Sequence, residues 1–270
     1  LGGNVYAFDS TTIDLCLSVF WWAKFRKKKG GIKVHTLYDV ETQIPAFFHI
    51  TEASVHDSKV MIEIPYEPSS YYIFDRGYNN FKILYKIHQI EAYFVVRAKK
   101  NLGYKSIQWK RRLPKNVLSD ASVFLTGFYP KQYYPEPLRL VKYWDEEQER
   151  EFTFITNAMH ISALQVAELY KNRWQVELFF KWLKQHLKIK RFWGTTENAV
   201  RIQIYAAICA YCLVAIIQHD MQLNRSTYEV LQILSISLTD KTHLRDLFDK
   251  TKFQNDKERF GPNGPSLFNF

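Results

Sequence analysis

The sequence predicts an α/β fold, in which a mixed β-sheet is flanked by helices and a β-rich insertion precedes a long helix. Three observations support this fold class. Runs of β-branched and aromatic residues, separated by polar or Gly-Gly breaks, open the chain, and strand and helix patterns then alternate. A segment rich in Pro and Tyr follows. Helical periodicity dominates the remainder of the chain.

The first part of the chain reads as strands, then as strands alternating with helices. The expected elements are strands over Val5–Asp9, Ile32–Val40, Ile44–Thr51, Tyr71–Asp75 and Ala92–Ala98, a short helix over His56–Ile64, and a helix carrying Phe81, Leu84, Ile87 and Ile90. The connection at Glu41–Gln43 is short enough for a hairpin. An antiparallel meander followed by crossover units is the element order of a ribonuclease-H-like core.

We divide the chain into four parts on this basis. Residues 1–98 form the first part of the ribonuclease-H-like core, and residues 161–218 form its remainder. Residues 99–160 hold the strand-like pieces Val123–Tyr129, Leu138–Trp144 and Arg150–Thr156, joined by turn signals, and are interpreted as the β-rich insertion. Residues 219–270 are expected to form C-terminal helices and a tail.

The composition favours a polyanionic partner. Lys and Arg number 37 against 27 Asp and Glu, and the net charge of +10 favours nucleic acid first and an anionic membrane surface second. The longest apolar run, Ile204–Ile217, is shorter than the ~20 residues that span a bilayer. We therefore expect this run to be a buried core helix, and we expect no membrane association.

Cysteine usage and the start of the chain bear on the compartment. Cys16, Cys209 and Cys212 make no disulfide framework in a chain of this length, which favours a reducing, cytoplasmic environment. Cys209 and Cys212 form a CxxC pair without a second pair or a nearby His, so we expect core packing on one helix face and no zinc site. The chain lacks a signal-peptide pattern and begins with Leu. We expect that an N-terminal portion is missing.

A long helix is expected from Ser162 to Ile189, beginning with a capping box formed by Ser162 and Gln165. At 100° per residue, one arc of this helix is apolar and forms the core face: Leu169, Val176, Phe180, Leu183 and Leu187. A polar arc lies directly beside it and holds Tyr170, Arg173, Glu177 and Lys184, with Lys181 and Lys188 at its border. Polar groups on the flank of a core face predict a cleft there.

Glu177 is the one acid among these cations. It has a simple explanation as a surface ion pair with Lys181, four residues on. The alternative is a metal site, because arginine and lysines along this helix could follow DNA phosphates while a divalent metal neutralises the acid. Two aspartates have matching positions: Asp9 ends the strand "VYAFD" and Asp75 ends "YYIFD". One such acid is typical of a turn or a helix cap, but two of them together with Glu177 favour a metal site.

These residues resemble a known family. Tyr170, Arg173, Glu177 and Lys184 reproduce the signature Y-x2-R-x3-E-x6-K of the bacterial insertion-sequence DDE transposases, specifically the insertion-sequence-four group. "FDSTT" and "FDRGYNNF" are similar to the blocks around that group's first and second catalytic aspartates. The resemblance extends from Tyr6 to about Ile217.

The resemblance implies a mechanism and a partner. Asp9, Asp75 and Glu177 would be the catalytic residues and would hold two Mg²⁺ or Mn²⁺ ions, which cut DNA at the ends of the element and join the freed 3′-hydroxyl to target DNA. Tyr170, Arg173, Lys184, Lys181 and Lys188 would bind DNA, the first three by gripping phosphates at the transposon end. Trp174 would stack on a flipped base, with burial in the core as the alternative. Joining two ends implies a homodimer in the DNA complex, in the bacterial cytoplasm.

Family members usually carry a DNA-recognition region before the first aspartate, and only a few residues precede Asp9 here. The basic run Phe25–His35 is interpreted either as a solvated loop or as a phosphate-contacting hairpin next to the Asp9 strand, and the basic, aromatic run Lys99–Arg112 as a DNA-contacting arm of the insertion. The block "SVHDS" is explained by helix capping through Ser54 or Asp57. Two rival functions stay open: a metal-dependent nuclease of the same fold that cuts without joining, and a non-catalytic DNA-binding derivative.

Overall fold

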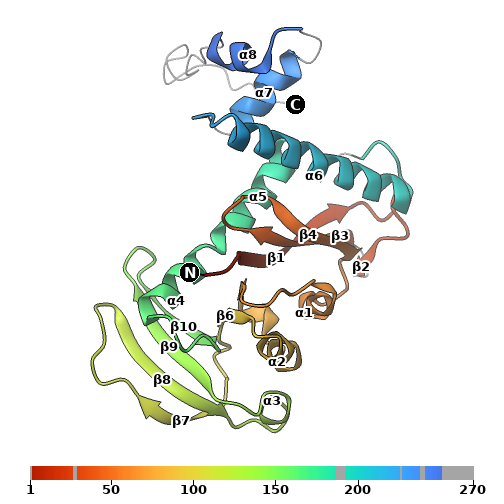
Figure 1. Ribbon diagram of the computed structural model, residues 1–270. Coiled ribbons are helices and arrows are strands. Elements are labelled where there is room, and N and C mark those ends of the chain that lie inside the picture. The colour runs from red at the N-terminus through yellow and green to blue at the C-terminus, as the bar shows by residue number, and fades with distance from the viewer. Residues whose placement is uncertain (1, 27–28, 187–191, 226, 238–240, 251–270) are drawn as a thin grey trace. The chain divides into compact units, whose positions relative to one another are not determined.

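A ten-stranded mixed sheet organises the protein. The computed structural model describes residues 2–26, 29–186, 192–225, 227–237 and 241–250 (Figure 1). Within this part the strands are β1 (Val5–Leu15), β2 (Lys24–Arg26), β3 (Lys29–Asp39), β4 (Pro45–Glu52), β5 (Tyr71–Phe74), β6 (Tyr93–Arg97), β7 (Tyr104–Trp109), β8 (Val117–Leu125), β9 (Leu138–Asp145) and β10 (Arg150–Thr156).

The strand order confirms the predicted fold class. The sheet runs β2-β3-β1-β5-β6-β10-β9-β8-β7, and β4 also pairs with β3. β1, β3 and β4 form the antiparallel meander, whereas β5 is parallel to β1 and β6 is parallel to β5. This is a ribonuclease-H-like core. The hairpin at Glu41–Gln43 is also as predicted, because the carboxylate of Asp39 accepts hydrogen bonds from the backbone N–H groups of Glu41 and Thr42.

Helices cover both faces of the core sheet because its central strands are apolar on both faces. All four residues of β5 are buried: Tyr72 and Phe74 join the cluster packed by α2 (Phe81–Gln89), while Tyr71 and Ile73 face α4 (Ala163–Lys171). The predicted helix over His56–Ile64 is present as α1 (Asp57–Val60) and a 3₁₀ turn over Met61–Glu63. A second 3₁₀ turn, over Arg76–Tyr78, follows Asp75.

The β-rich insertion extends the core sheet, because β10 pairs antiparallel with β6 and β7–β9 continue outward from it. The strand expected over Val123–Tyr129 is wrong in its second half: β8 ends at Leu125, and α3 (Phe128–Tyr133) follows Gly127, where Pro130 favours a helical first turn.

A buried ion pair ties the insertion to the helix that follows it. Arg139 on β9 donates from Nε and Nη2 to the two carboxylate oxygens of Asp120 on β8, at 2.7 and 2.8 Å. Its Nη1 donates to the backbone oxygen of Ile161 at 2.5 Å, next to the first turn of α4. Both side chains are almost fully buried. The pair therefore sets where α4 begins relative to the sheet.

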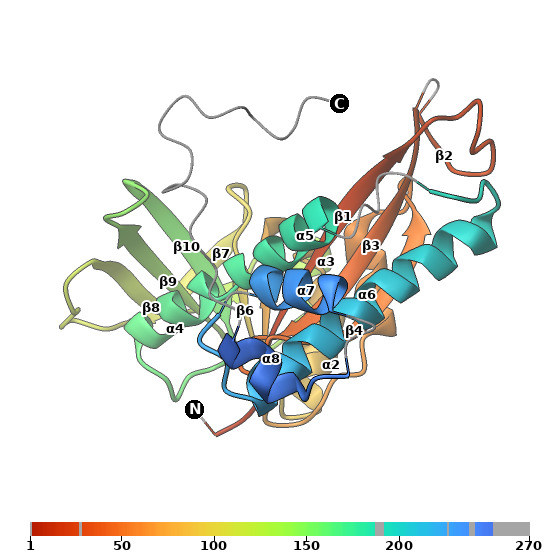
Figure 2. The same cartoon turned by 90° about the horizontal axis from the view of Figure 1, so that it is seen from above.

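The long helix expected over Ser162–Ile189 is two helices, α4 (Ala163–Lys171) and α5 (Trp174–His186). The capping box of Ser162 and Gln165 is confirmed. The helix is interrupted at Asn172, a residue of low helix propensity, and the N–H of Arg173 bonds the oxygen of Tyr170 three residues back. In Figure 2, α4 and α5 run in succession across the sheet, and α4 packs on β5 and β6 whereas α5 packs on β1. Leu187 and Lys188 lie outside the described residues.

The apolar run 204–217 lies within α6 (Glu197–Asp220), but only one face of this helix is buried. Ile204, Ile208 and Tyr211 are buried, whereas Leu213 is 62% exposed. The expected core packing of both cysteines is wrong: Cys209 is exposed and Cys212 is partly exposed. Their positions on the helix explain this, because at 100° per residue Cys209 is about 140° and Cys212 about 80° from Ile204 on the buried face.

Of the helices in the described ranges, α6 alone is long and apolar enough to cross a membrane by length and composition. About a third of its most apolar stretch is buried, and core helices often pass the same test.

The chain separates into two compact units, residues 1–209 and residues 210–270. The second unit contains α7 (Thr227–Ile236) and α8 (Leu244–Lys250), with a small core of Val214, Val230, Ile233 and Phe248. The four-part division drawn from the sequence stays a prediction.

Candidate active site

Asp9 and Asp75 lie at the edge where two parallel strands part. Asp9 does not end its strand, as the sequence suggested, because β1 continues to Leu15 through its pairing with β3. The pairing of β1 with β5, however, stops at Phe8 and Phe74, one residue before each aspartate. Ligand-binding residues often follow the carboxyl ends of parallel strands, because the strands separate there.

Glu177 comes to the same edge from α5. Val176, Phe179 and Phe180 are buried on this helix, and the ring of Phe179 packs against that of Tyr38 on β3 with centroids 5.4 Å apart. The predicted core face is thus confirmed in its described part. It holds Glu177, in the first turn of α5, next to β1.

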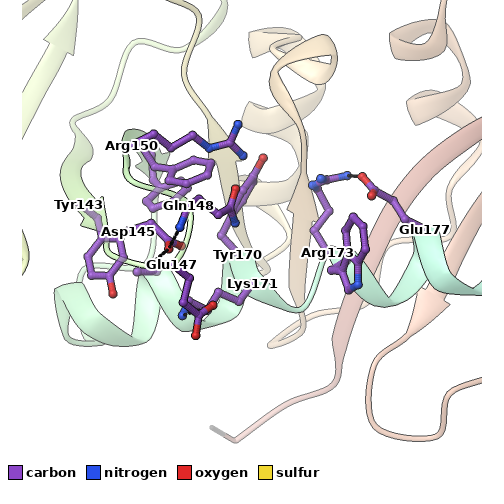
Figure 3. Close-up of a pocket in the computed structure, with 13 residues that line it drawn as sticks. Tyr143, Asp145, Glu147, Gln148, Arg150, Tyr170, Lys171, Arg173 and Glu177 are labelled. Carbon is purple, nitrogen blue, oxygen red and sulfur yellow. Dashed lines mark hydrogen bonds and ion pairs between the residues drawn. The ribbon is translucent and has the colours of Figure 1, made fainter.

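Arg173 joins two of the three acids. Its Nη1 lies 2.8 Å from Oδ2 of Asp9 and 2.6 Å from Oε1 of Glu177; Figure 3 shows the guanidinium and the Glu177 carboxylate facing each other. Glu177 therefore forms an ion pair, but with Arg173 rather than with Lys181. Because the same nitrogen also contacts Asp9, this is no isolated surface pair on one helix.

Tyr170 joins the third acid to the same helical segment. Its hydroxyl donates to Oδ1 of Asp75 at 2.8 Å, and its ring is 7% exposed between Phe152 and Phe154 of β10. Arg97, at the end of β6, lies 3.9 Å from the same oxygen. The break at Asn172 lets Tyr170 on α4 contact Asp75 while Arg173, just past α4, contacts Asp9.

A second group of contacts holds Asp9 from its other side, and the sequence analysis missed it. Oδ1 of Asp9 accepts from the N–H of Ser10 at 2.8 Å and from the buried hydroxyl of Tyr78 at 3.4 Å. The hydroxyl of Ser10 donates to Asp57 at 2.8 Å, and Asp57 also pairs with Lys33 at 3.0 Å.

Two signals for this group were present in the sequence. Tyr78 belongs to "FDRGY", and Asp57 belongs to "SVHDS". The expectation that Asp57 or Ser54 caps a helix is wrong: His56 is the N-cap residue of α1, accepting from the N–H of Ser58. The carboxylate of Asp57 is directed to Ser10 and Lys33.

The two aspartates differ in their electrostatics. Burial raises the pKa of Asp9 to about 6; Ser10 and Arg173 act against this rise, and the negative charges of Asp75 and Glu177 add to it. Burial also acts to raise the pKa of Asp75, but hydrogen bonds from the backbone of Arg76 and from Tyr170, with the charges of Arg173 and Arg97, hold it below its usual value. Burial acts to lower the pKa of Arg173, but the pKa is raised above its usual value by interactions with Tyr170, Asp9 and Glu177.

Two grooves meet at Glu177. One cavity of about 660 Å³ lies between β9–β10 and the α4–α5 segment, and its lining includes Arg150, Tyr170, Arg173 and Trp174 (Figure 3). The other, of about 500 Å³, runs from Asp9 along α5 to Lys181 and Lys184.

Most of the predicted DNA-binding residues line these two grooves: Tyr170, Arg173 and Trp174 line the first, and Lys181 and Lys184 line the second. Trp174 is 58% exposed, so the alternative of a buried Trp is wrong. Lys188 lies outside the described residues.

The carboxylates fit a divalent metal by chemistry. Mg²⁺ and Mn²⁺ prefer oxygen ligands, and a positive group already lies between Asp9 and Glu177. In the described part of the chain, no three acidic, His or Cys side chains are grouped as a ready-made metal site. Arg173 and Tyr170 connect the three acids instead, so a metal would compete with Arg173 for Asp9 and Glu177.

The sequence matches the family described as "Transposase DDE domain" over residues 1–213. It is 37% identical over 246 residues to the protein y4zB of Sinorhizobium fredii, which is named as a transposase, covering 88% of this chain and 67% of that protein. A protein of Geobacillus stearothermophilus named as the transposase of insertion sequence element IS5377 is 31% identical over 76% of this chain. This chain spans 54% of that relative's length.

The fold is also found in a solved structure. A piggyBac transposase, solved in a synaptic complex with hairpin DNA, aligns with 97% of this chain and 59% of its own, with a TM-score of 0.53 and 14% identity. That likeness concerns the fold alone. Together, the family match over most of the sequence, the relatives and the ribonuclease-H-like sheet show that this chain belongs to the DDE transposase domain family and forms its catalytic domain.

Proposed function

We propose that this domain cuts DNA at the ends of an insertion sequence and joins the freed 3′-hydroxyl to target DNA. In this proposal Asp9, Asp75 and Glu177 are the catalytic residues and the ligands of two Mg²⁺ or Mn²⁺ ions. One observation carries it: Asp9 and Glu177, far apart in the sequence, lie 2.8 and 2.6 Å from the same nitrogen of Arg173. Two carboxylates around one cation are what a bridging metal requires.

The residues divide the work as follows. Asp9 has Oδ1 occupied by Ser10 and Tyr78, which leaves Oδ2 directed towards the shared cation. Tyr170 orients Asp75, and α5 brings Glu177 to the sheet edge. Bound metal ions would supply the activated nucleophile and stabilise the leaving oxygen of an in-line displacement.

DNA binding is assigned to the segment around Glu177. Arg173 would pass from the carboxylates to a phosphate, which frees both acids for metal. Lys181 and Lys184 line the groove that leads from Asp9 along α5, and with Lys188 they would follow the backbone of one strand. Tyr170 and the exposed Trp174 border the other cavity, where Trp174 would stack on an unpaired base.

The family assignment supports the wider setting. A distant relative of the same fold was solved as a synaptic complex with hairpin DNA. We propose that this protein likewise acts on transposon ends and target DNA, as a homodimer in the DNA complex and in the bacterial cytoplasm. The insertion-sequence-four group is assigned through the signature of Tyr170, Arg173, Glu177 and Lys184.

The test is a combined cleavage and joining assay. The protein is incubated with the DNA ends that flank its gene, a supercoiled target plasmid and Mg²⁺ or Mn²⁺. We expect both cleaved and joined products, and D9N, D75N and E177Q should each reduce both by at least about a thousandfold. E168Q, which alters an exposed acid on the neighbouring helix α4, is the matched control and should keep parental activity.

The same assay separates the rivals. Cleavage without joined product would identify a nuclease of this fold. DNA binding without either product, under both metals, would identify a non-catalytic derivative and would remove the proposed role of the three acids.

A further inference from the structure

Two exposed tryptophans lie in two loops, one that follows the C-terminal end of β1 and one that precedes α6. Trp21, in the loop between β1 and β2, is 73% exposed, and Trp193, in the loop before α6, is 98% exposed. Single exposed apolar side chains are common on protein surfaces, whereas exposed apolar side chains that are grouped together mark binding sites. We call the segments 20–22 and 192–195 together the tryptophan tip.

The two loops of the tryptophan tip are fastened to each other. Nε1 of Trp22 donates to the backbone oxygen of Thr195 at 2.8 Å, and the rings of Phe20 and Phe192 meet edge to face with centroids 5.9 Å apart. The residues next to the exposed indoles therefore face inward and hold the loops together. Trp21 and Trp193 alternate with them and face outward.

The second loop is also fixed to α6. The backbone N–H of Trp193 donates to Gln203, and a Cβ at Gly194 would lie only 2.5 Å from Cβ of Ala199. Glycine is thus required where the loop passes α6. A fixed backbone under an exposed indole suits a stacking platform, because little conformational entropy is lost when a ligand binds.

Basic residues near the two loops in the sequence favour a negatively charged ligand. The sequence from Lys24 to Lys29 holds five cations and no acid, and Lys184, Lys188, Lys190 and Arg191 precede Phe192 without an acid among them. In the described part, Lys24 and Lys29 are exposed. The acids nearest to the two loops in the sequence are Asp14, which is exposed, and Glu197, which is paired with Arg201 at 2.8 Å. Exposed aromatics among cations are the signature of a nucleic-acid stacking surface.

The proposed function gives the spacing between the tip and the active site. The groove lined by Lys181 and Lys184 follows α5 from Asp9, and β1 runs from Asp9 to Leu15, about 20 Å at the rise of a strand. The loop that carries Trp21 begins beyond Leu15, so at 3.4 Å per phosphate along one strand the tip would lie at least about six nucleotides from Asp9.

We propose that the tryptophan tip is a second DNA-binding surface, on which Trp21 and Trp193 stack on bases of single-stranded or locally unpaired DNA at least about six nucleotides from the active site. The binding surface is inferred from the exposure of Trp21 and Trp193, from the contacts that hold the two loops together and from the basic residues near them in the sequence. The six-nucleotide spacing alone rests on the proposed function. Its binding partner is DNA with accessible base faces, because the indoles have no such face to meet in an intact duplex.

Binding of fluorescein-labelled single-stranded 20-mers tests the proposal, with a duplex of the same sequence as comparison and without metal, so that catalysis plays no part. Stacking is worth roughly 5- to 150-fold in affinity per base. We expect W21A and W193A each to weaken single-strand binding by at least about fivefold, with less than about twofold change for the duplex. F128A removes an equally exposed aromatic side chain, 79% exposed on α3, and should leave both affinities unchanged.

The proposal is overturned if W21A and W193A bind the single strand as the parent does, or if both DNA forms lose affinity equally. It is also overturned if the parent self-associates without DNA and the variants lose only that association, which would make the tip a contact between copies. Thermal unfolding of each variant verifies that the loops remain folded. D9N should lose cleavage activity but bind the single strand as the parent does. That result would show that DNA binding at the tryptophan tip is independent of the catalytic role proposed for Asp9.

Discussion

Nη1 of Arg173 lies 2.8 Å from Oδ2 of Asp9, whereas Oδ1 of the same carboxylate accepts hydrogen bonds from Ser10 and Tyr78. The same nitrogen contacts Glu177, so the guanidinium lies between the two carboxylates that we propose as metal ligands. The Nε atom of Arg173 is buried and has no hydrogen-bond partner among the described residues. Nη1 of Arg173 is thus bound to two carboxylates while its Nε makes no hydrogen bond within the described part of the chain. This partial hydrogen bonding favours an exchange of the carboxylates for a DNA phosphate.

Arg173→Ala should therefore have opposite effects on metal and DNA binding. Without DNA, the variant is expected to bind Mn²⁺ several-fold more tightly, because no internal cation competes for Asp9 and Glu177. With DNA, it should lose affinity and joining activity, because a phosphate contact is gone. Electron paramagnetic resonance of free Mn²⁺ measures the first effect and fluorescence anisotropy the second. Equal or weaker Mn²⁺ binding by the variant would contradict the competition; K82A, at an exposed lysine of α2, is the control.

The pKa shifts of Asp9 and Asp75 predict opposite effects on stability. For Asp9, the folded pKa of about 6 lies above the usual 3.8, so the folded state retains the proton longer and stability falls as pH rises from about 4 to about 6. Asp9→Asn should thus raise the free energy of unfolding at pH 7.5 without metal, by on the order of 1–3 kcal/mol, and change little at pH 4.

For Asp75 the folded pKa is lowered, so its contribution to stability is present above the unfolded pKa and is lost as pH falls through the folded one. Asp75→Asn should accordingly destabilise the protein at pH 7.5. Urea unfolding of both variants at the two pH values measures the effects. The same sign for both variants at pH 7.5 would show that the electrostatics of the site are not as described.

Tyr78 is expected to act as a positioning residue for Asp9. Its hydroxyl and the N–H of Ser10 both contact Oδ1, which orients Oδ2 towards the shared cation. Removing a residue that orients a metal ligand typically costs 10- to 100-fold in metal affinity or activity. Because the hydrogen bond is long, at 3.4 Å, we expect about tenfold for Tyr78→Phe.

The metal dependence of the rate distinguishes positioning from general stability. Tyr78→Phe should raise the Mg²⁺ concentration needed for half-maximal activity while the free energy of unfolding changes by less than about 1.5 kcal/mol. Tyr66→Phe removes a hydroxyl that donates to the backbone oxygen of Met61, away from the acids. This control should leave the Mg²⁺ dependence unchanged, and an identical response of the two variants would exclude the positioning role.

Local patterns were sufficient to predict most elements of the core sheet and of the helix that carries Glu177. The strands of the core, the capping box at Ser162 and the core face with Val176 and Phe180 follow from periodicity and capping chemistry, which act within a few residues. The extension of β1 beyond Asp9 did not, because "STTIDL" is not strongly apolar and becomes a strand through pairing with β3. The break at Asn172 was not predicted either, because a single residue of low helix propensity does not by itself show where a helix is interrupted.

The supporting contacts around Asp9 could not be predicted for the same reason. Asp57 stands in a block that looks like a helix cap, and its contacts with Ser10 and Lys33 join three segments far apart in sequence. Which face of α6 is buried also depended on tertiary packing, since a run that is apolar on all sides does not show which side the rest of the protein covers, and Cys209 lies on an exposed side.

The buried pair of Arg139 and Asp120 predicts how the insertion influences the site. Arg139→Ala leaves Asp120 buried, with Lys110 at 3.1 Å as its one remaining charged partner among the described residues, and releases the oxygen of Ile161 at the start of α4. Removing one partner of a buried pair costs about 3–5 kcal/mol, so a clear loss of unfolding free energy is expected in urea titration. The double variant R139M/D120L, which removes both charges, should recover most of that loss. If stability recovers but joining activity does not, the pair acts on Tyr170 by fixing where α4 begins; if both recover, its role is stability alone.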